Sequence, residues 1–169
     1  MLFRSFSEEP QDPPAGTKFS LGSSMLFAKE HLQCPFVFHA GDTIIKEPIP
    51  SPENRNWNYG FPAKDSTHYT TFDIIDGKIP SINEKGAKNF QLAHIGLVGI
   101  KDYALFWECL EGLYKKDPTD TALNDTRAIN EMLKKGAVFE PMESKTWLDI
   151  GNPESLKNAR DKIREYFPY

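Results

Sequence analysis

The stretch PFVFHAGD at residues 35–42 decides the fold class of this 169-residue chain. Its first four residues form a continuous apolar run, which is typical of a strand covered on both faces, as in a parallel sheet. Apolar side chains at helical spacing over residues 19–32 precede it and predict one uninterrupted helix. A helix followed by a buried strand indicates an α/β fold.

Further strand signals follow this stretch. Residues 69–75 and 78–83 are strand-like, and the Asp76-Gly77 pair between them favours a tight hairpin turn. Residues 91–100 form another candidate strand. By contrast, residues 48–62 contain four prolines and three asparagines, and this composition predicts a long surface loop.

Three helices are predicted in the second half of the chain. The first two cover residues 102–116 and 125–135, and Gly136 is placed to end the second. The third begins at Pro153, where Asn152 can cap the free backbone amides. The sequence therefore predicts a mixed sheet with helices on its faces.

Composition argues against several classes of function. Hydrophobic residues make up 39% and charged residues 26% of the chain, which is typical of one soluble globular domain. The net charge of −4 argues against a nucleic-acid partner, and no apolar stretch is long enough for a membrane span or a secretory signal. Cys34 and Cys109 have no metal-ligand spacing, so we expect two reduced core thiols in a cytoplasmic protein.

Two acids are candidates for catalytic chemistry. Asp42 stands just past the carboxyl end of the predicted strand, after Gly41, and ligands of open α/β sheets gather at the carboxyl ends of strands. Asp149 precedes the last helix, next to Gly151, and Trp147 can wall a pocket there. Carboxylates in such places can hold Mg2+. The alternative is that Asp42 caps a turn and that Asp149 marks a simple strand–turn–helix junction.

The segment TWLDIGNP at residues 146–153 resembles the late signature of the sugar-1-phosphate nucleotidyltransferases, also called NDP-sugar pyrophosphorylases. Other segments resemble further family motifs and occur in the family's order: QDPPAGT at 11–17, FHAGD at 38–42, DGK at 76–78 with NEK at 83–85, and HIGL at 94–97. An ordered set of motifs is more specific than any one of them.

The resemblance implies a Rossmann-like mixed sheet flanked by helices, of the nucleotide-diphospho-sugar transferase type. It implies that a nucleoside triphosphate and a sugar 1-phosphate react to give an NDP-sugar and pyrophosphate, as in nucleotide-sugar biosynthesis. In this scheme Asp42 and Asp149 are catalytic and hold Mg2+. The residues implied to bind substrate are Gln11 for the base, Gly16 and Thr17 at the nucleotide turn, Glu84 for sugar hydroxyls, Lys85 for phosphate, Gly96 beside the sugar, and Trp147.

The sequence departs from the family pattern at several places. It has no glycine-rich loop with Arg and Lys, so we expect a partial domain over residues 11–169 that lacks the N-terminal strands of the fold, with residues 1–10 unmatched. We therefore expect the chain alone to be inactive. Tyr69 stands where the family has glycine and is expected to crowd the sugar. An alternative register places Gly22-Ser23-Ser24, rather than Gly16-Thr17, at the nucleotide turn.

Other interpretations of the same residues stay open. The chain could be a non-catalytic sugar-nucleotide-binding or regulatory domain of the same fold, and a homo-oligomer is compatible with either function. Glu84 and Lys85 could be a solvated charge pair. Residues 123–127 match an acidic family pattern only loosely, and they indicate a helix start rather than ligands. A metal-dependent glycosyltransferase is disfavoured, because Asp42-Thr43-Ile44 is not an Asp-x-Asp motif.

Overall fold

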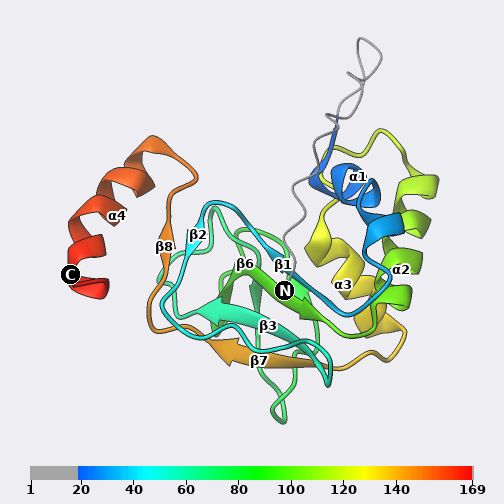
Figure 1. Cartoon of the computed structure of the whole chain (residues 1–169), viewed down its shortest axis with the longest axis horizontal. Coiled ribbons are helices and arrows are strands. Elements are labelled where there is room, and N and C mark those ends of the chain that lie inside the picture. The colour runs from blue at the N-terminus through cyan, green and yellow to red at the C-terminus, as the bar shows by residue number, and fades with distance from the viewer. Residues whose placement is uncertain (1–18, 169) are drawn as a thin grey trace.

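The computed structural model of the protein describes residues 19–168, and its central strand is β6, Leu92–Ile100 (Figure 1). β6 pairs antiparallel with β1, β3 and β4, and together with β5 and β7 these form one six-stranded mixed sheet. The remaining members of this sheet are β1 (Phe36–His39), β3 (Asn56–Phe61), β4 (Thr71–Phe72), β5 (Ile82–Asn83) and β7 (Phe139–Glu143). β3 and β7 run parallel to each other.

Two short strands form a separate ladder next to the sheet. β2 (Thr43–Ile44) follows β1 after a turn, and β8 (Leu148–Asp149) precedes the last helix. They pair antiparallel, with Thr43 opposite Asp149 and Ile44 opposite Leu148. This ladder therefore joins segments that are more than one hundred residues apart in the sequence.

The helices divide into two groups (Figure 1). Three of them lie together on one side of the molecule: α1 (Leu21–Leu26), α2 (Tyr103–Lys116) and α3 (Asp125–Lys134), with the short 3-10 helix η1 (Lys29–His31) after α1. The fourth, α4 (Pro153–Tyr166), stands at the opposite end and packs mainly against β8.

Each face of the sheet has its own hydrophobic core. On the helix-covered face, residues of α2 and α3 such as Phe106, Leu110 and Ile129 pack against sheet residues such as Val98. The other core is smaller and consists of Trp57, Tyr59, Ile95 and Leu97, with Trp147 packed against it. Burial of these large side chains is the main force that holds the layers together.

The local signals that predicted turns and helix ends are confirmed. Asp76 and Gly77 have backbone φ angles of 49° and 72°, as a tight hairpin turn requires, and Ile75 bridges to Lys78 across it. The strands beside this turn are shorter than predicted. The Asn152 side chain accepts hydrogen bonds from the amides of Glu154 and Ser155 at the start of α4. The mixed sheet with flanking helices is also confirmed.

Two predictions near the start of the chain are wrong. Residues 19–32 form α1 and η1 rather than one helix, because Ser20 and Ser23 build a capping box that starts α1 at Leu21, and α1 ends at Leu26. β1 is antiparallel to β6, and its residues are mostly half-buried rather than covered on both faces. Antiparallel strands tolerate one exposed face.

The loop predicted over residues 48–62 is wrong for its last part. Residues 56–61 form β3, an almost completely buried strand between β6 and β7. Its asparagines are tolerated because they are hydrogen-bonded: Asn56 donates to the Asp102 carboxylate and accepts from the amides of Lys101 and Asp102. The core position predicted for Cys34 is also wrong, since Cys34 is exposed, whereas Cys109 is buried; both are free thiols.

Candidate functional site

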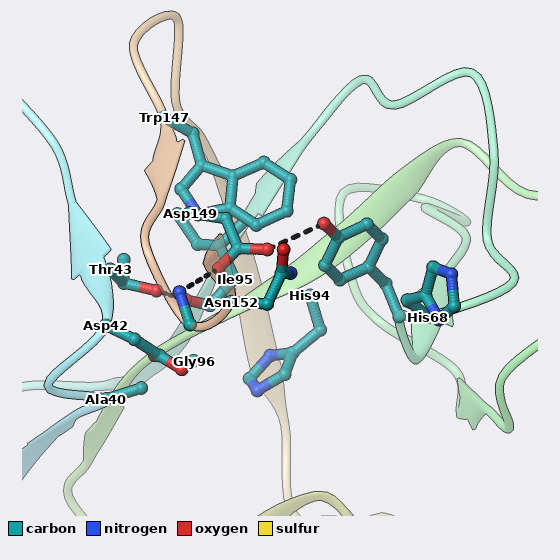
Figure 2. A pocket seen from close by; sticks show the side chains of 12 residues that line it. Ala40, Asp42, Thr43, His68, His94, Ile95, Gly96, Trp147, Asp149 and Asn152 are labelled. Atoms are coloured by element: carbon teal, nitrogen blue, oxygen red, sulfur yellow. Dashed lines mark hydrogen bonds between the residues drawn. The ribbon is translucent and has the colours of Figure 1, made fainter. Parts of the chain in front are cut away.

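A pocket of about 340 Å3 lies where the β2–β8 ladder meets β6 (Figure 2). It is lined by four segments: the turn after β1, the loop before β4, the middle of β6, and the segment around β8. The lining residues are Ala40, Asp42, Thr43, His68, Tyr69, His94, Ile95, Gly96, Trp147, Asp149, Gly151 and Asn152. The pocket thus contains four of the residues that were predicted to bind substrate or metal: Asp42, Gly96, Trp147 and Asp149.

The two predicted acids converge in this pocket. A Cβ atom placed on Gly151 would lie 2.7 Å from Oδ2 of Asp42 and 3.2 Å from Oδ1 of Asp149. Both oxygens therefore border one small space that exists because residue 151 has no side chain. The backbone holds this arrangement, since the Ile150 amide donates to the Asp42 carbonyl at 2.9 Å. We define Asp42 and Asp149 as the acid pair.

Asp149 has a hydrogen-bond donor at each of its oxygens. The Gly151 amide donates to Oδ1 at 2.8 Å, and the Tyr69 hydroxyl donates to Oδ2 at 2.8 Å (Figure 2). Burial, followed by this hydrogen bond and by the charge of Asp149, raises the pKa of Tyr69 to about 12. The Tyr69 hydroxyl therefore stays protonated, and can donate, throughout the neutral pH range.

Aromatic rings form one wall of the pocket. The rings of Tyr69 and Trp147 meet edge to face, with centroids 4.9 Å apart, and Trp147 also contacts Phe61 at 5.5 Å. Such contacts hold both rings in fixed positions. The wall can exclude water from one side of a bound ligand.

A third carboxylate, that of Glu47, fixes the loop that carries Trp147. Glu47 accepts hydrogen bonds from the amides of Lys145 and Thr146 and from the hydroxyls of Ser144 and Thr146. Partial burial raises the pKa of Glu47, but the hydrogen bonds from Thr146 and Lys145 outweigh it and lower the pKa from 4.5 to about 2. Glu47 thereby ties the segment after β2 to the segment before β8.

A buried polar cluster lies beneath the pocket. The His94 ring places Nδ1 2.8 Å from Oδ1 of Asn58 and Nε2 3.3 Å from Oδ2 of Asp125, and all three residues are at most 9% exposed. Buried polar groups are costly unless they satisfy one another. We define Asn58, His94 and Asp125 as the histidine cluster; of its members only His94 lines the pocket.

Gly96 lies at the pocket wall on β6. Its φ angle is +71°, and a Cβ atom there would come within 2.6 Å of the Ala40 side chain. A side chain at this position would therefore be strained and would collide with the turn that leads to Asp42.

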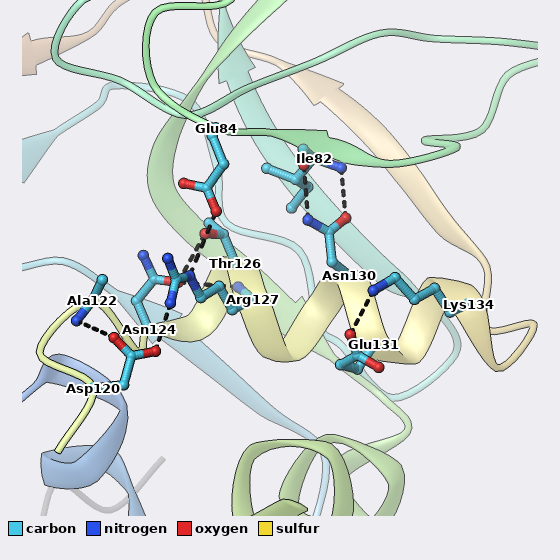
Figure 3. Close-up of polar contacts among 10 residues, drawn as sticks. All are labelled: Ile82, Glu84, Asp120, Ala122, Asn124, Thr126, Arg127, Asn130, Glu131 and Lys134. Carbon is cyan, nitrogen blue, oxygen red and sulfur yellow. Dashed lines mark hydrogen bonds and ion pairs between the residues drawn. The ribbon is translucent and has the colours of Figure 1, made fainter. Parts of the chain in front are cut away.

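Two predicted substrate-binding residues lie elsewhere. Glu84 is exposed at the end of β5, where its carboxylate lies 3.5 Å from the Arg127 guanidinium (Figure 3). Arg127 in turn pairs with Asp120 at 2.6 Å. Lys85 is exposed as well, and neither Glu84 nor Lys85 lines the pocket. Their proposed contacts to sugar hydroxyls and phosphate remain predictions.

The predicted nucleotide-binding residues Gln11, Gly16 and Thr17 lie outside the described residues, and so does the predicted boundary between residues 10 and 11. In the alternative register, Gly22 is buried in α1, where its amide donates to the Leu123 carbonyl at 2.9 Å. A Cβ atom there would lie 2.5 Å from the Leu123 side chain. Close packing of α1 is therefore a sufficient reason for glycine at position 22.

The acid pair provides a suitable, though incomplete, set of ligands for Mg2+. Hard carboxylate oxygens suit this ion, which usually takes only one or two carboxylates and completes its shell with phosphate oxygens and water. The small space beside Gly151 lies next to an oxygen of each acid. Within residues 19–168, no group of three or more His, Cys, Asp or Glu side chains could hold a metal ion. A cation here would therefore share its shell with other ligands.

Solved structures show the same fold. No family model and no curated protein matches the sequence. A phosphocholine cytidylyltransferase from Streptococcus pneumoniae has a TM-score of 0.70 and 12% identity, with 86% of this chain and 64% of that chain covered. A UDP-glucose pyrophosphorylase in complex with UDP-glucose has a TM-score of 0.68 and 16% identity, covering 88% and 63%. An inositol-1-phosphate CTP transferase from T. maritima has a TM-score of 0.63 and 9% identity, covering 88% and 64%.

These comparisons define the class of fold. The chain has the fold of the nucleotidyltransferases, which agrees with the fold that the sequence motifs implied. It spans 63–64% of the length of the three solved chains. Separately, among the helices within residues 19–168, none combines the length and apolarity needed to cross a membrane.

Sequence reasoning missed several pocket residues. His68 and His94 were not proposed as site residues. Asp125, which lies beneath the pocket beside His94, was interpreted only as part of a helix start. The sequence carried one usable signal for this side of the pocket: Tyr69, which stands where the resembled family has glycine and which lines the pocket next to His68. The pairing of Asp125 with His94 had no such signal, because thirty residues separate them along the chain.

Proposed function

We propose that the protein belongs to the sugar-1-phosphate nucleotidyltransferases and contributes the sugar-phosphate side of their reaction. In that reaction an oxygen of the sugar phosphate attacks the α-phosphorus of a nucleoside triphosphate, and pyrophosphate leaves. The observation that supports this best is the convergence of Asp42 and Asp149 at Gly151. The nucleotidyltransferase fold supports it independently.

The residues of the pocket fit distinct tasks in this proposal. Asp42 and Asp149 would hold Mg2+, which when bound neutralises and orients phosphate oxygens. Tyr69 and Trp147 exclude water from one side of the ligand. Gly96 lets a ligand come close to the β6 backbone, and His94 presents a polar floor. Catalysis would thus rest on positioning and charge neutralisation.

The first test is cation binding. Mn2+, as a stand-in for Mg2+, is titrated into the chain and free Mn2+ is followed by electron paramagnetic resonance. Asp42→Asn and Asp149→Asn should each weaken binding at least about tenfold, because each removes one charged ligand. Asp161→Asn, on the exposed side of α4, is the matched control and should bind as the wild type does. Equal Mn2+ affinity of the wild type and all three variants would refute the proposed cation site.

Turnover is the second readout. The sequence has no glycine-rich phosphate loop, so we expect little pyrophosphate release when the chain is mixed with Mg2+, nucleoside triphosphates and glucose 1-phosphate. Robust release would contradict this expectation.

The missing loop also favours a second candidate, a non-catalytic domain that binds a sugar nucleotide. Tight binding of UDP-glucose without turnover would support that candidate over the first.

A further inference from the structure

We propose that Tyr69 is a positioning residue for the acid pair, which fixes the Asp149 carboxylate so that its Oδ1 atom faces Asp42. The inference rests on the proposed function, because it gives Tyr69 a role toward the cation that the acid pair would hold. No family motif that we identified in the sequence assigns this role to Tyr69.

The two oxygens of Asp149 have separate tasks in this arrangement. Oδ1 borders the space beside Gly151, together with Oδ2 of Asp42. Oδ2 accepts the Tyr69 hydroxyl at 2.8 Å. With the Gly151 amide bound to Oδ1, the carboxylate cannot turn about its Cβ–Cγ bond without breaking a hydrogen bond. The hydroxyl therefore selects which oxygen is offered to a ligand.

Tyr69 itself is held firmly enough to act as a fixed donor. Its ring packs edge to face on Trp147, and its backbone amide donates to the Ser66 carbonyl at 3.1 Å. Trp147 is supported in turn by Phe61 and by the loop that Glu47 ties down. Groups that orient a metal ligand work only if they are themselves immobile.

The test separates the hydroxyl from the ring. Tyr69→Phe keeps the aromatic wall and removes only the donor, so the variant should fold and should bind Mn2+ about tenfold more weakly than the wild type. Tyr59→Phe is the matched control, because it also removes one tyrosine hydroxyl, one that donates to the Pro48 carbonyl at 3.1 Å, away from the acid pair. Tyr59→Phe should leave Mn2+ affinity unchanged.

Each outcome has one meaning. If Asp149→Asn loses Mn2+ and Tyr69→Phe binds it as well as the wild type, or more tightly, the role of Tyr69 is refuted and the proposed function stands. If Asp42→Asn and Asp149→Asn both bind normally, the proposed site itself is refuted. A second measurement needs no variant: in crystals soaked with Mn2+, the bond between Tyr69 and Oδ2 of Asp149 should persist while Oδ1 contacts the ion. Loss of that bond would overturn the proposal.

Discussion

The acid pair lines the pocket and the histidine cluster lies beneath it, and the two are built in opposite ways. Asp42 and Asp149 stand on a turn and on a two-residue strand, and Asp42 is exposed. The histidine cluster stands on the long strands β3 and β6 and on the first turn of α3, almost completely buried. The first arrangement leaves carboxylates open to a ligand. The second buries its polar groups against one another, and within residues 19–168 Nδ2 of Asn58 and Oδ2 of Asp125 have no hydrogen-bond partner.

This contrast teaches where stability and binding reside. Surface carboxylates contribute little to folding, so they are free to serve a ligand. A buried ionisable pair is costly to disrupt, because removal of one partner leaves the other without compensation. We therefore expect substitutions in the histidine cluster to change the free energy of unfolding, and substitutions in the acid pair to change ligand affinity.

The largest effect is expected from Asp125→Asn. It removes the charge that faces Nε2 of His94 at 3.3 Å within the core, and the free energy of unfolding should fall by about 3 kcal/mol. Urea unfolding followed by circular dichroism measures this change. Asp120→Asn is the control, because Asp120 pairs with Arg127 near the surface and should cost less than about 1 kcal/mol. Equal losses in the two variants would remove the distinction between buried and exposed acids.

Gly151→Ala tests the acid pair, where we expect a change in cation affinity rather than in stability. Its methyl group would lie 2.7 Å from Oδ2 of Asp42, so Mn2+ affinity should fall at least tenfold, or about 1.4 kcal/mol. The free energy of unfolding should change by less than about 1 kcal/mol. Gly112→Ala is the control, since a methyl group on that exposed residue of α2 meets no atom within 4 Å other than its chain neighbours and the backbone of its own helix. A Gly151→Ala protein that binds Mn2+ normally would show that the space beside Gly151 is not used.

The smallest effect is expected from Glu47→Gln, and it depends on pH. Because the pKa of Glu47 is lowered from 4.5 to about 2 in the folded protein, its carboxylate stabilises the fold above pH 4.5. That contribution is lost as the pH falls toward 2. The variant should be less stable than the wild type by about 1 kcal/mol at pH 7, and by much less at pH 3. A difference that is constant with pH, measured by urea unfolding, would contradict the lowered pKa.

The sequence predicted those parts of the site that depend on local chemistry. Asn152 and Pro153 predicted the start of α4, and Asp149 and Gly151 lie just before it. Caps and turns are local devices, so a short window of sequence contains the information that defines them. The family resemblance pointed to Asp42 as a partner of Asp149. In the structure, the pairing of β2 with β8 brings the two acids to the same pocket.

The sequence did not predict the parts that depend on distant partners. Asn56 and Asn58 indicated a loop, but β3 accepts them because Asp102 and His94 provide hydrogen bonds across the sheet. Strand preference is weak wherever tertiary contacts satisfy the side chains. β7 gave no strand signal, because Pro141 in its middle argues against a strand. The strand forms through its parallel pairing with β3, a long-range contact that a short window of sequence does not contain.

The two-residue ladder between β2 and β8 has a consequence for local opening. α4 packs mainly on β8, so separation of β8 from β2 would release β8 and α4 together while the six-stranded sheet stays intact. A cation shared by Asp42 and Asp149 would cross-link β2 and β8 and so oppose their separation. The Ile150 N–H donates across this ladder to the Asp42 carbonyl. A free cation concentration of about ten times the dissociation constant should slow amide hydrogen exchange at Ile150 by about one order of magnitude.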